Sequence, residues 1–128
     1  MFGTFQQSNI RIEIAVSEQA LRESLVQTDK LRKWLFPQRL SNGLPEELRP
    51  GLSFTSWIGP ISIVHSVEYV EADTLLLLLS HGIDGFHEWR WGEGWVQSRL
   101  EGVALLPISL GQTLSLSRLR QFLTTSNS

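Results

Sequence analysis

The stretch from Thr74 to Leu106 constrains the fold most strongly, because apolar and polar residues alternate along much of it between recognisable turn signals. Alternation with a period of two is typical of β-strands that bury one face. Glycine, proline and acidic residues interrupt the extended pattern at four places: Gly59-Pro60, Glu71 to Thr74, Asp84-Gly85 and Gly92 to Gly94. The sequence therefore predicts five consecutive strands from Leu52 onward, joined by hairpins.

The Asp84-Gly85 pair is the clearest of these turn signals, because a two-residue type I′ loop needs positive φ at both positions. Such a loop would set three cross-strand pairs: Gly82 with His87, Ser80 with Trp89 and Leu78 with Trp91. An even-length loop after Trp91 then separates polar from apolar residues best. It predicts four further pairs: Trp91 with Val96, Trp89 with Ser98, His87 with Leu100 and, on the other face, Glu88 with Arg99.

The same register, followed back through the earlier turns, gathers aromatic and small polar residues on one inner face. It predicts four pairs there: Tyr69 with Leu76, Val67 with Leu78, His65 with Ser80 and Phe54 with His65. An apolar pocket with a few converging polar groups is typical of small-ligand sites. The candidate ligand-binding residues, with Trp34 from the preceding helical segment, are His65, Val67, Tyr69, Leu78, Ser80, His87, Trp89, Trp91, Ser98 and Trp34.

Some conspicuous residues fall outside this inner face or lack a chemical signature. Trp57, Trp95 and His81 are predicted to face outward, with His81 opposite Glu88. His65 and Ser80 lack an inward acid that would complete a nucleophilic triad. His65 and His87 lie two strands apart, about 9 to 10 Å, which is too far for a shared zinc ion. We therefore expect no catalytic residue, no metal and no cofactor.

The remaining segments predict a first strand, two helical regions and a long connection. Alternating isoleucines indicate a strand ending near Val16, and Ser17 is a suitable N-cap for a helix from Glu18 to Leu35. Thr28 and Asp29 favour a split of this helix into two. The segment from residue 37 to 51 is predicted to be a surface connection with one helical turn at residues 45–48. A C-terminal helix of three to four turns should follow Pro107.

Composition limits the function classes. The 128 residues suit one domain, residues 1–128, and the net charge of -2 without a basic patch argues against nucleic acid. Cysteine is absent, which excludes disulfides and fits a reducing compartment. The start lacks a secretory signal pattern, and the longest apolar run, Leu75 to Leu79, is too short to span a bilayer. We expect a cytoplasmic protein without stable membrane insertion, and a homo-oligomer stays open.

The order of these elements, with four local motifs, resembles the Bet v 1-like, START-related SRPBCC superfamily. The motifs are the Ser17 helix entry, VQTDKLRKWLFP at 26–37, GLSFTSW at 51–57 and SLSRLRQFL at 115–123. The resemblance implies an α+β helix-grip fold, in which a curved antiparallel sheet of about six strands wraps the C-terminal helix. Many members have seven strands and a longer helix than the one predicted here.

The resemblance also implies a function, which leaves three hypotheses. The first is non-enzymatic binding or transport of an apolar small molecule (a lipid, polyketide or aromatic compound) between sheet and helix. The second is a cyclase or aromatase-like enzyme with His65 or His87 as general acid or base and Tyr69 assisting. The third is a protein-interaction module, as in the Hsp90-activator branch, with the cavity filled by side chains. Cavity volume separates the third from the others.

Overall fold

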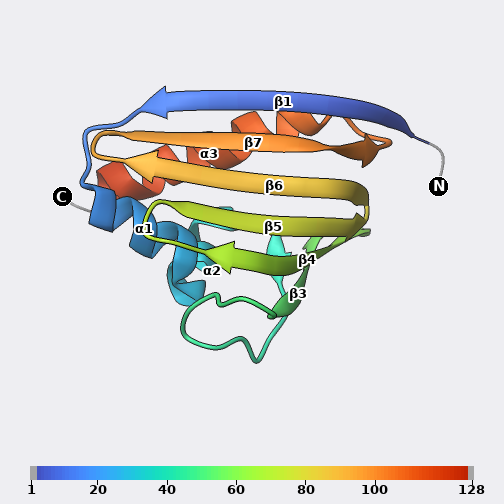
Figure 1. The fold of residues 1–128 in the computed structure, drawn as a ribbon, viewed down its shortest axis with the longest axis horizontal. Helices are drawn as coiled ribbons and strands as arrows, with labels where there is room; N and C mark the ends of the chain where they lie inside the picture. The colour runs from blue at the N-terminus through green and yellow to red at the C-terminus, as the bar shows by residue number, and fades with distance from the viewer. Residues whose placement is uncertain (1–2, 127–128) are drawn as a thin grey trace.

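The computed structural model describes residues 3–126, which form one seven-stranded antiparallel sheet and three helices (Figure 1). In chain order the elements are β1 (Thr4–Glu13), α1 (Glu18–Val26), α2 (Thr28–Leu35), β2 (Arg39–Leu40), β3 (Ser53–Ile58), β4 (Ile61–Val70), β5 (Thr74–His81), β6 (Ile83–Gly92), β7 (Trp95–Ala104) and α3 (Ile108–Ser126). The strand order is β1-β7-β6-β5-β4-β3-β2. The predicted α+β, helix-grip architecture is confirmed.

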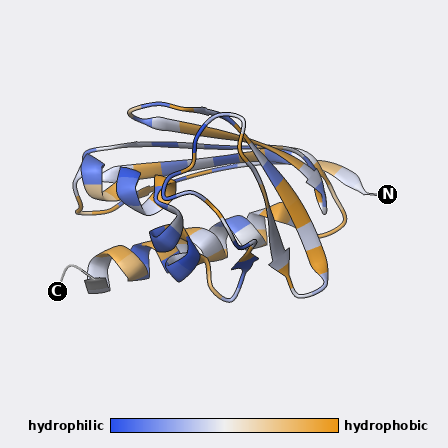
Figure 2. Cartoon of the chain, turned by 90° about the horizontal axis from the view of Figure 1, so that it is seen from below, coloured by the Kyte–Doolittle hydropathy of each residue, from blue (hydrophilic) through white to orange (hydrophobic). Residues whose placement is uncertain are grey.

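The helices lie on one side of the curved sheet, with α3 running along it (Figure 2). Helix α3 packs against β1, β7 and the other two helices. It buries Leu116, Leu119 and Leu123 in the main core. At 19 residues, α3 has about five turns and is longer than predicted. Burial of this apolar stripe outweighs the poor helix propensity of the Gly, Ser and Thr residues near its start.

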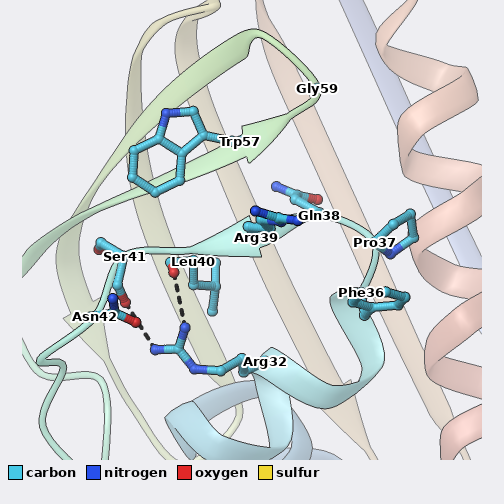
Figure 3. A pocket seen from close by; sticks show the side chains of 10 residues that line it. All are labelled: Arg32, Phe36, Pro37, Gln38, Arg39, Leu40, Ser41, Asn42, Trp57 and Gly59. Atoms are coloured by element: carbon cyan, nitrogen blue, oxygen red, sulfur yellow. Dashed lines mark hydrogen bonds between the residues drawn. The ribbon is translucent and has the colours of Figure 1, made fainter.

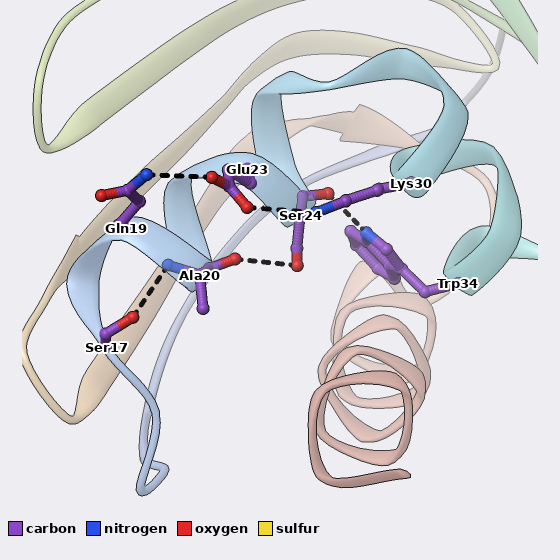
Figure 4. A network of polar contacts seen from close by, with 7 residues as sticks. All are labelled: Ser17, Gln19, Ala20, Glu23, Ser24, Lys30 and Trp34. Atoms are coloured by element: carbon purple, nitrogen blue, oxygen red, sulfur yellow. Dashed lines mark hydrogen bonds and ion pairs between the residues drawn. The ribbon is translucent and has the colours of Figure 1, made fainter. Parts of the chain in front are cut away.

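Helices α1 and α2 are separate, as predicted, and they fix the position of Trp34 (Figure 4). Gln27 has an extended backbone between them, and Ser17 Oγ accepts a hydrogen bond from the Ala20 amide at the start of α1. Trp34 Nε1 donates to the Ser24 carbonyl over 2.7 Å. Hydrogen bonds from Gln19 and Lys30 lower the pKa of Glu23, whose carboxylate lies 3.1 Å from Lys30 Nζ. The bonds from Trp34 to Ser24 and from Lys30 to Glu23 tie α2 to α1.

The connection between α2 and β3 differs from the prediction in two ways. It contains the short strand β2, which brings the sheet to seven strands where six were predicted. Residues 45–48 do not form a helical turn. They run along the junction of α1 and α2, where Thr28 Oγ1 donates to the Pro45 carbonyl and the Leu48 amide donates to the Val26 carbonyl. These tertiary bonds take the place of a local helical bond.

The predicted register between β5 and β6 is wrong. Leu77 lies opposite His87 and Leu75 opposite Trp89, so the turn is centred on Gly82, next to His81, which has a φ of +73°. Gly85 is not a turn residue but lies within β6. A Cβ on Gly85 would lie only 1.9 Å from the Glu101 carbonyl oxygen of β7. This glycine permits a close approach between strands, and that requirement explains why Asp84-Gly85 was misleading.

A β-bulge explains the second register error. The pairing of β4 with β5 shifts between Val67 and Tyr69, so Val67 lies opposite Leu77 and His65 opposite Leu79. The predicted pairs of Tyr69 with Leu76 and of Phe54 with His65 are confirmed. All four pairs predicted between β6 and β7, including Trp89 with Ser98 and Glu88 with Arg99, are confirmed as well.

Candidate functional site

A cavity of about 420 Å³ lies between the inner face of the sheet and helices α2 and α3. Most of its lining is apolar, contributed by leucines, isoleucines, Phe54 and the tryptophans Trp34 and Trp89. No Asp, Glu, Lys or Arg of the described residues lines it. Its polar groups are few: His65, His87, Gln38, Gln112 and Ser115. The cavity is therefore an uncharged space with a small set of hydrogen-bonding groups.

The mouth of the cavity is marked by lining residues that are also exposed. Leu105, Leu106 and Leu110, in the link from β7 to α3 and in its first turn, are all exposed, as is Ile58 at the turn between β3 and β4. Leu110 is the most exposed of them, at 69 %. A small molecule would enter past this apolar rim.

His87 projects from β6 into the cavity. Its Nε2 lies 2.7 Å from Ser98 Oγ on β7, and its ring centroid lies 4.6 Å from that of Trp89. Burial, with a smaller contribution from His65, lowers the pKa of His87 to about 3. The ring keeps some accessible surface because it faces a cavity, although protein surrounds it. His87 is therefore neutral at physiological pH.

His65 occupies the corresponding position on β4. Its Nε2 lies 2.8 Å from Ser56 Oγ on β3, and its ring stacks on Phe54 with a centroid distance of 4.7 Å. Ser56 Oγ also accepts a hydrogen bond from Gln38 Nε2 over 2.8 Å. Burial lowers the pKa of His65 to about 4, so this ring is also neutral at physiological pH. The cavity thus contains two Ser-His pairs, each assisted by a glutamine.

Gln112 is the glutamine of the other pair and is 2 % exposed. Its Nε2 donates to the Ser98 carbonyl over 2.7 Å and lies 3.0 Å from Ser98 Oγ. Sequence reasoning missed Gln112, Gln38 and the role of Ser56. An inward alternation position could have indicated Ser56. No local pattern marks either glutamine.

Two tryptophans form part of the cavity wall. The rings of Trp34 and Trp89 meet edge to face, with centroids 6.1 Å apart and planes at 84°. The bond from Trp34 to Ser24 holds its ring in place. Each tryptophan also borders the cavity, so both are placed to report a change inside it by fluorescence.

The structure brings only some of the predicted site residues to the cavity. Trp34, His65, His87 and Trp89 line it, and Ser98 is fully buried behind His87. Val67 and Trp91 are buried in the core without lining the cavity.

Three predicted site residues lie on the opposite face of the sheet. Leu78 is 44 % exposed and Ser80 is exposed, because the true register of β5 turns their side chains outward. Tyr69 shares this face with Leu76 because of the bulge in β4. The expected pair of His65 with Ser80 is therefore wrong, as is that of His81 with Glu88, which lies opposite Leu76.

A second hollow, of about 930 Å³, lies beside β2 and is bordered by Trp57 and Phe36 (Figure 3). Phe36 is 62 % exposed and Trp57 38 % exposed. Arg32, which also lines it, donates to the carbonyl oxygens of Leu40 and Ser41, both over 2.9 Å. The cation is thus used to hold β2 in place. This hollow is larger than the cavity, but none of the described residues that line it has a buried polar side-chain atom without a hydrogen-bond partner.

Among residues 3–126, no group of three or more histidines and acidic residues is arranged to hold a metal ion. Within the same range, no helix combines the length and the apolar character needed to cross a membrane.

Comparison with known proteins gives similarity at the level of structure alone. No family model matches the sequence, and no curated protein matches it. DynU16, a protein of the dynemicin biosynthetic locus, superposes with a TM-score of 0.73 at 18 % identity, over 94 % of this chain. This chain spans about half of DynU16, 48 % of its length.

Two bacterial proteins match over nearly their whole length. CV1439 from Chromobacterium violaceum has a TM-score of 0.70 at 13 % identity, over 90 % of this chain and 94 % of its own. MLL2253 from Mesorhizobium loti has a TM-score of 0.68 at 18 % identity, over 94 % and 98 %. At these identities the likeness establishes a shared fold.

Proposed function

We propose that this protein binds a neutral, largely apolar small molecule in the cavity between the sheet and α3. The observation that carries the proposal is the 420 Å³ cavity itself, which is lined by apolar side chains and by two neutral imidazoles. Small-molecule sites combine these features: a concave apolar surface and a few polar groups that orient the ligand.

The absence of charge in the lining determines which ligands the cavity favours. A charged ligand would lose its hydration on entering, and no described lining residue offers an opposite charge in return. A neutral ligand avoids this cost and gains from the burial of apolar surface. We therefore place fatty acids and other anions below neutral aromatic or acyl compounds as candidate ligands.

The proposal includes membership of the SRPBCC superfamily. Its support is the helix-grip arrangement of the sheet and α3, together with the structural likeness to DynU16 and the bacterial proteins. The sequence motifs around Ser17, Trp34 and Phe54 add to this support. Binding of the small molecule is the proposed function, and its transport would be a further activity that requires release of the bound molecule.

The two alternative functions have weaker support. A general base works best with a pKa near the operating pH, and burial moves the pKa values of His65 and His87 far below it. No described acid lines the cavity to raise them again. The interaction-module hypothesis required an interior filled by side chains, and the open volume beside Trp89 argues against it.

Native mass spectrometry of the freshly purified protein tests the proposal, with organic extraction to identify any bound compound. Titration with neutral aromatic and acyl compounds should quench tryptophan fluorescence, because Trp34 and Trp89 border the cavity. Quenching should be smaller in Trp89→Phe and unchanged in the matched control Trp57→Phe on the outer surface. A protein that carries no compound and whose fluorescence ignores the whole panel would contradict the proposal.

A further inference from the structure

The carbonyl oxygens around the Gln112 side-chain amide determine its orientation, which leaves Gln112 Oε1 buried without a hydrogen-bond partner among the described residues. One end of the amide lies 2.7 Å from the Ser98 carbonyl and 3.2 Å from the Ser8 carbonyl. Carbonyl oxygens only accept hydrogen bonds, so the end that faces them must be the NH₂ group. The same NH₂ group lies 3.0 Å from Ser98 Oγ and shares its two hydrogens among the three oxygens. Because an NH₂ group only donates, the hydroxyl oxygen accepts from Gln112.

This orientation in turn determines the direction of the bond between Ser98 and His87. The Ser98 hydroxyl has one hydrogen, and among the described residues the only recorded acceptor for it is His87 Nε2, 2.7 Å away. If Ser98 donates to Nε2, this nitrogen carries a lone pair. A neutral imidazole then has its proton on Nδ1. The low pKa of His87 supports the neutral form.

The Nδ1–H group of His87 is thus a hydrogen-bond donor with no recorded partner among residues 3–126. Nδ1 of His65 also has no partner, but it is sealed from the cavity, whereas Nδ1 of His87 is not. The two pairs therefore differ in what they offer. The series of hydrogen bonds from Gln38 through Ser56 to His65 ends at a nitrogen buried inside the protein. The series from Gln112 through Ser98 to His87 ends at a nitrogen that faces the cavity.

We propose that the ligand carries an uncharged acceptor oxygen, such as a ketone, quinone or ester carbonyl, which accepts a hydrogen bond from His87 Nδ1–H. This inference rests on the proposed function and names the ligand class. The rest of the ligand lies against Trp34, Trp89 and the leucines of β5 that line the cavity. His87 selects the oxygen, while Ser98 and Gln112 act as positioning residues that hold the required tautomer.

A matched pair of probes tests the inference without any change to the protein. Acetylnaphthalene and ethylnaphthalene have nearly the same shape, but only the first has a carbonyl. By calorimetric titration the ketone should bind roughly threefold to tenfold more tightly, the range expected for one net hydrogen bond. Equal affinities would overturn this inference and leave the proposed function standing. If neither probe nor any other neutral apolar compound binds, the proposed function fails as well.

Two variants locate the donor. In His87→Phe the ketone and the hydrocarbon should bind with equal affinity, whereas His65→Phe, the matched control, should keep the preference for the ketone. A preference that survives in His87→Phe would overturn the assignment. Nitrogen NMR of the imidazole rings in the unmodified, ligand-free protein is independent of how the variants fold. It should show the Nδ1–H tautomer for His87, and the Nε2–H tautomer would refute the inference.

Discussion

His87 Nε2 lies 2.7 Å from Ser98 Oγ, on neighbouring strands, at a position where both side chains face inward. The hydroxyl serves two partners at once, because it also lies 3.0 Å from Gln112 Nε2 on α3. The pair therefore connects the sheet to the helix that covers it. A change at Ser98 should therefore alter both the stability of the fold and the hydrogen bonding of His87 in the cavity.

Replacing Ser98 by alanine should lower the free energy of unfolding by about 1–3 kcal/mol, because the buried Nε2 of His87 loses its partner. The matched control is Ser80→Ala on the exposed face of β5, which should change the free energy of unfolding by less than about 0.5 kcal/mol. Urea unfolding measures both. Equal decreases in the free energy of unfolding in the two variants would show that the Ser98–His87 hydrogen bond does not stabilise the fold.

The free energy of unfolding should depend on pH through His65 and His87. Both are neutral in the folded protein down to about pH 4, whereas in the unfolded chain they take up protons near pH 6.5. Below pH 6.5 the unfolded state therefore binds more protons, and stability falls as the pH falls toward 4. Each histidine contributes a slope of up to about 1.4 kcal/mol per pH unit within this window.

Urea unfolding at intervals from pH 7 to about pH 5 avoids the range in which most carboxylates titrate. Above pH 7 these two groups should have no effect on the free energy of unfolding. His87→Phe should reduce the slope by about half, since one of the two titrating groups is gone. An unchanged slope in this variant would show that His87 is not a buried neutral group.

Two glycine variants test the close approach of β6 and β7. Gly85→Ala would put a Cβ 1.9 Å from the Glu101 carbonyl oxygen, so we expect a loss of several kcal/mol or failure to fold. Gly111→Ala, in α3, meets no atom within 4 Å and should stabilise the protein by about 0.5–1 kcal/mol. Thermal unfolding of the two variants checks both signs. A well-folded Gly85→Ala protein would contradict the strand geometry.

The sequence predicts the strand register correctly where the two faces of the sheet differ chemically. Between β6 and β7, Trp89 and Ser98 lie on one face and Glu88 and Arg99 on the other, so a slip of one residue would mix them, and this register was predicted correctly. In β5 the run from Leu75 to Leu79 consists of leucine alone. It contains no alternation that could distinguish the inner from the outer face, and the predicted register is wrong there.

Other features depend on contacts that no local pattern contains. The bulge between Val67 and Tyr69 and the tight contact at Gly85 are set by neighbouring strands. The positions of the glutamines in the site also depend on distant contacts, because Gln112 meets Ser98 only after α3 folds onto the sheet. Four of the ten predicted site residues, Trp34, His65, His87 and Trp89, line the cavity. The two predicted site residues of the leucine run and its end, Leu78 and Ser80, face the other side of the sheet.

The most direct test of ligand binding in the cavity compares two substitutions on neighbouring residues of β5. Leu79 lines the cavity, and Leu78 points to the opposite face of the sheet. Leu79→Trp should narrow the cavity and weaken binding of a neutral aromatic ligand measured by calorimetry, while Leu78→Trp should bind as the unmodified protein does. Both variants should keep their circular dichroism spectra. An affinity that is unchanged in a folded Leu79→Trp protein would contradict the proposal that the ligand occupies this cavity.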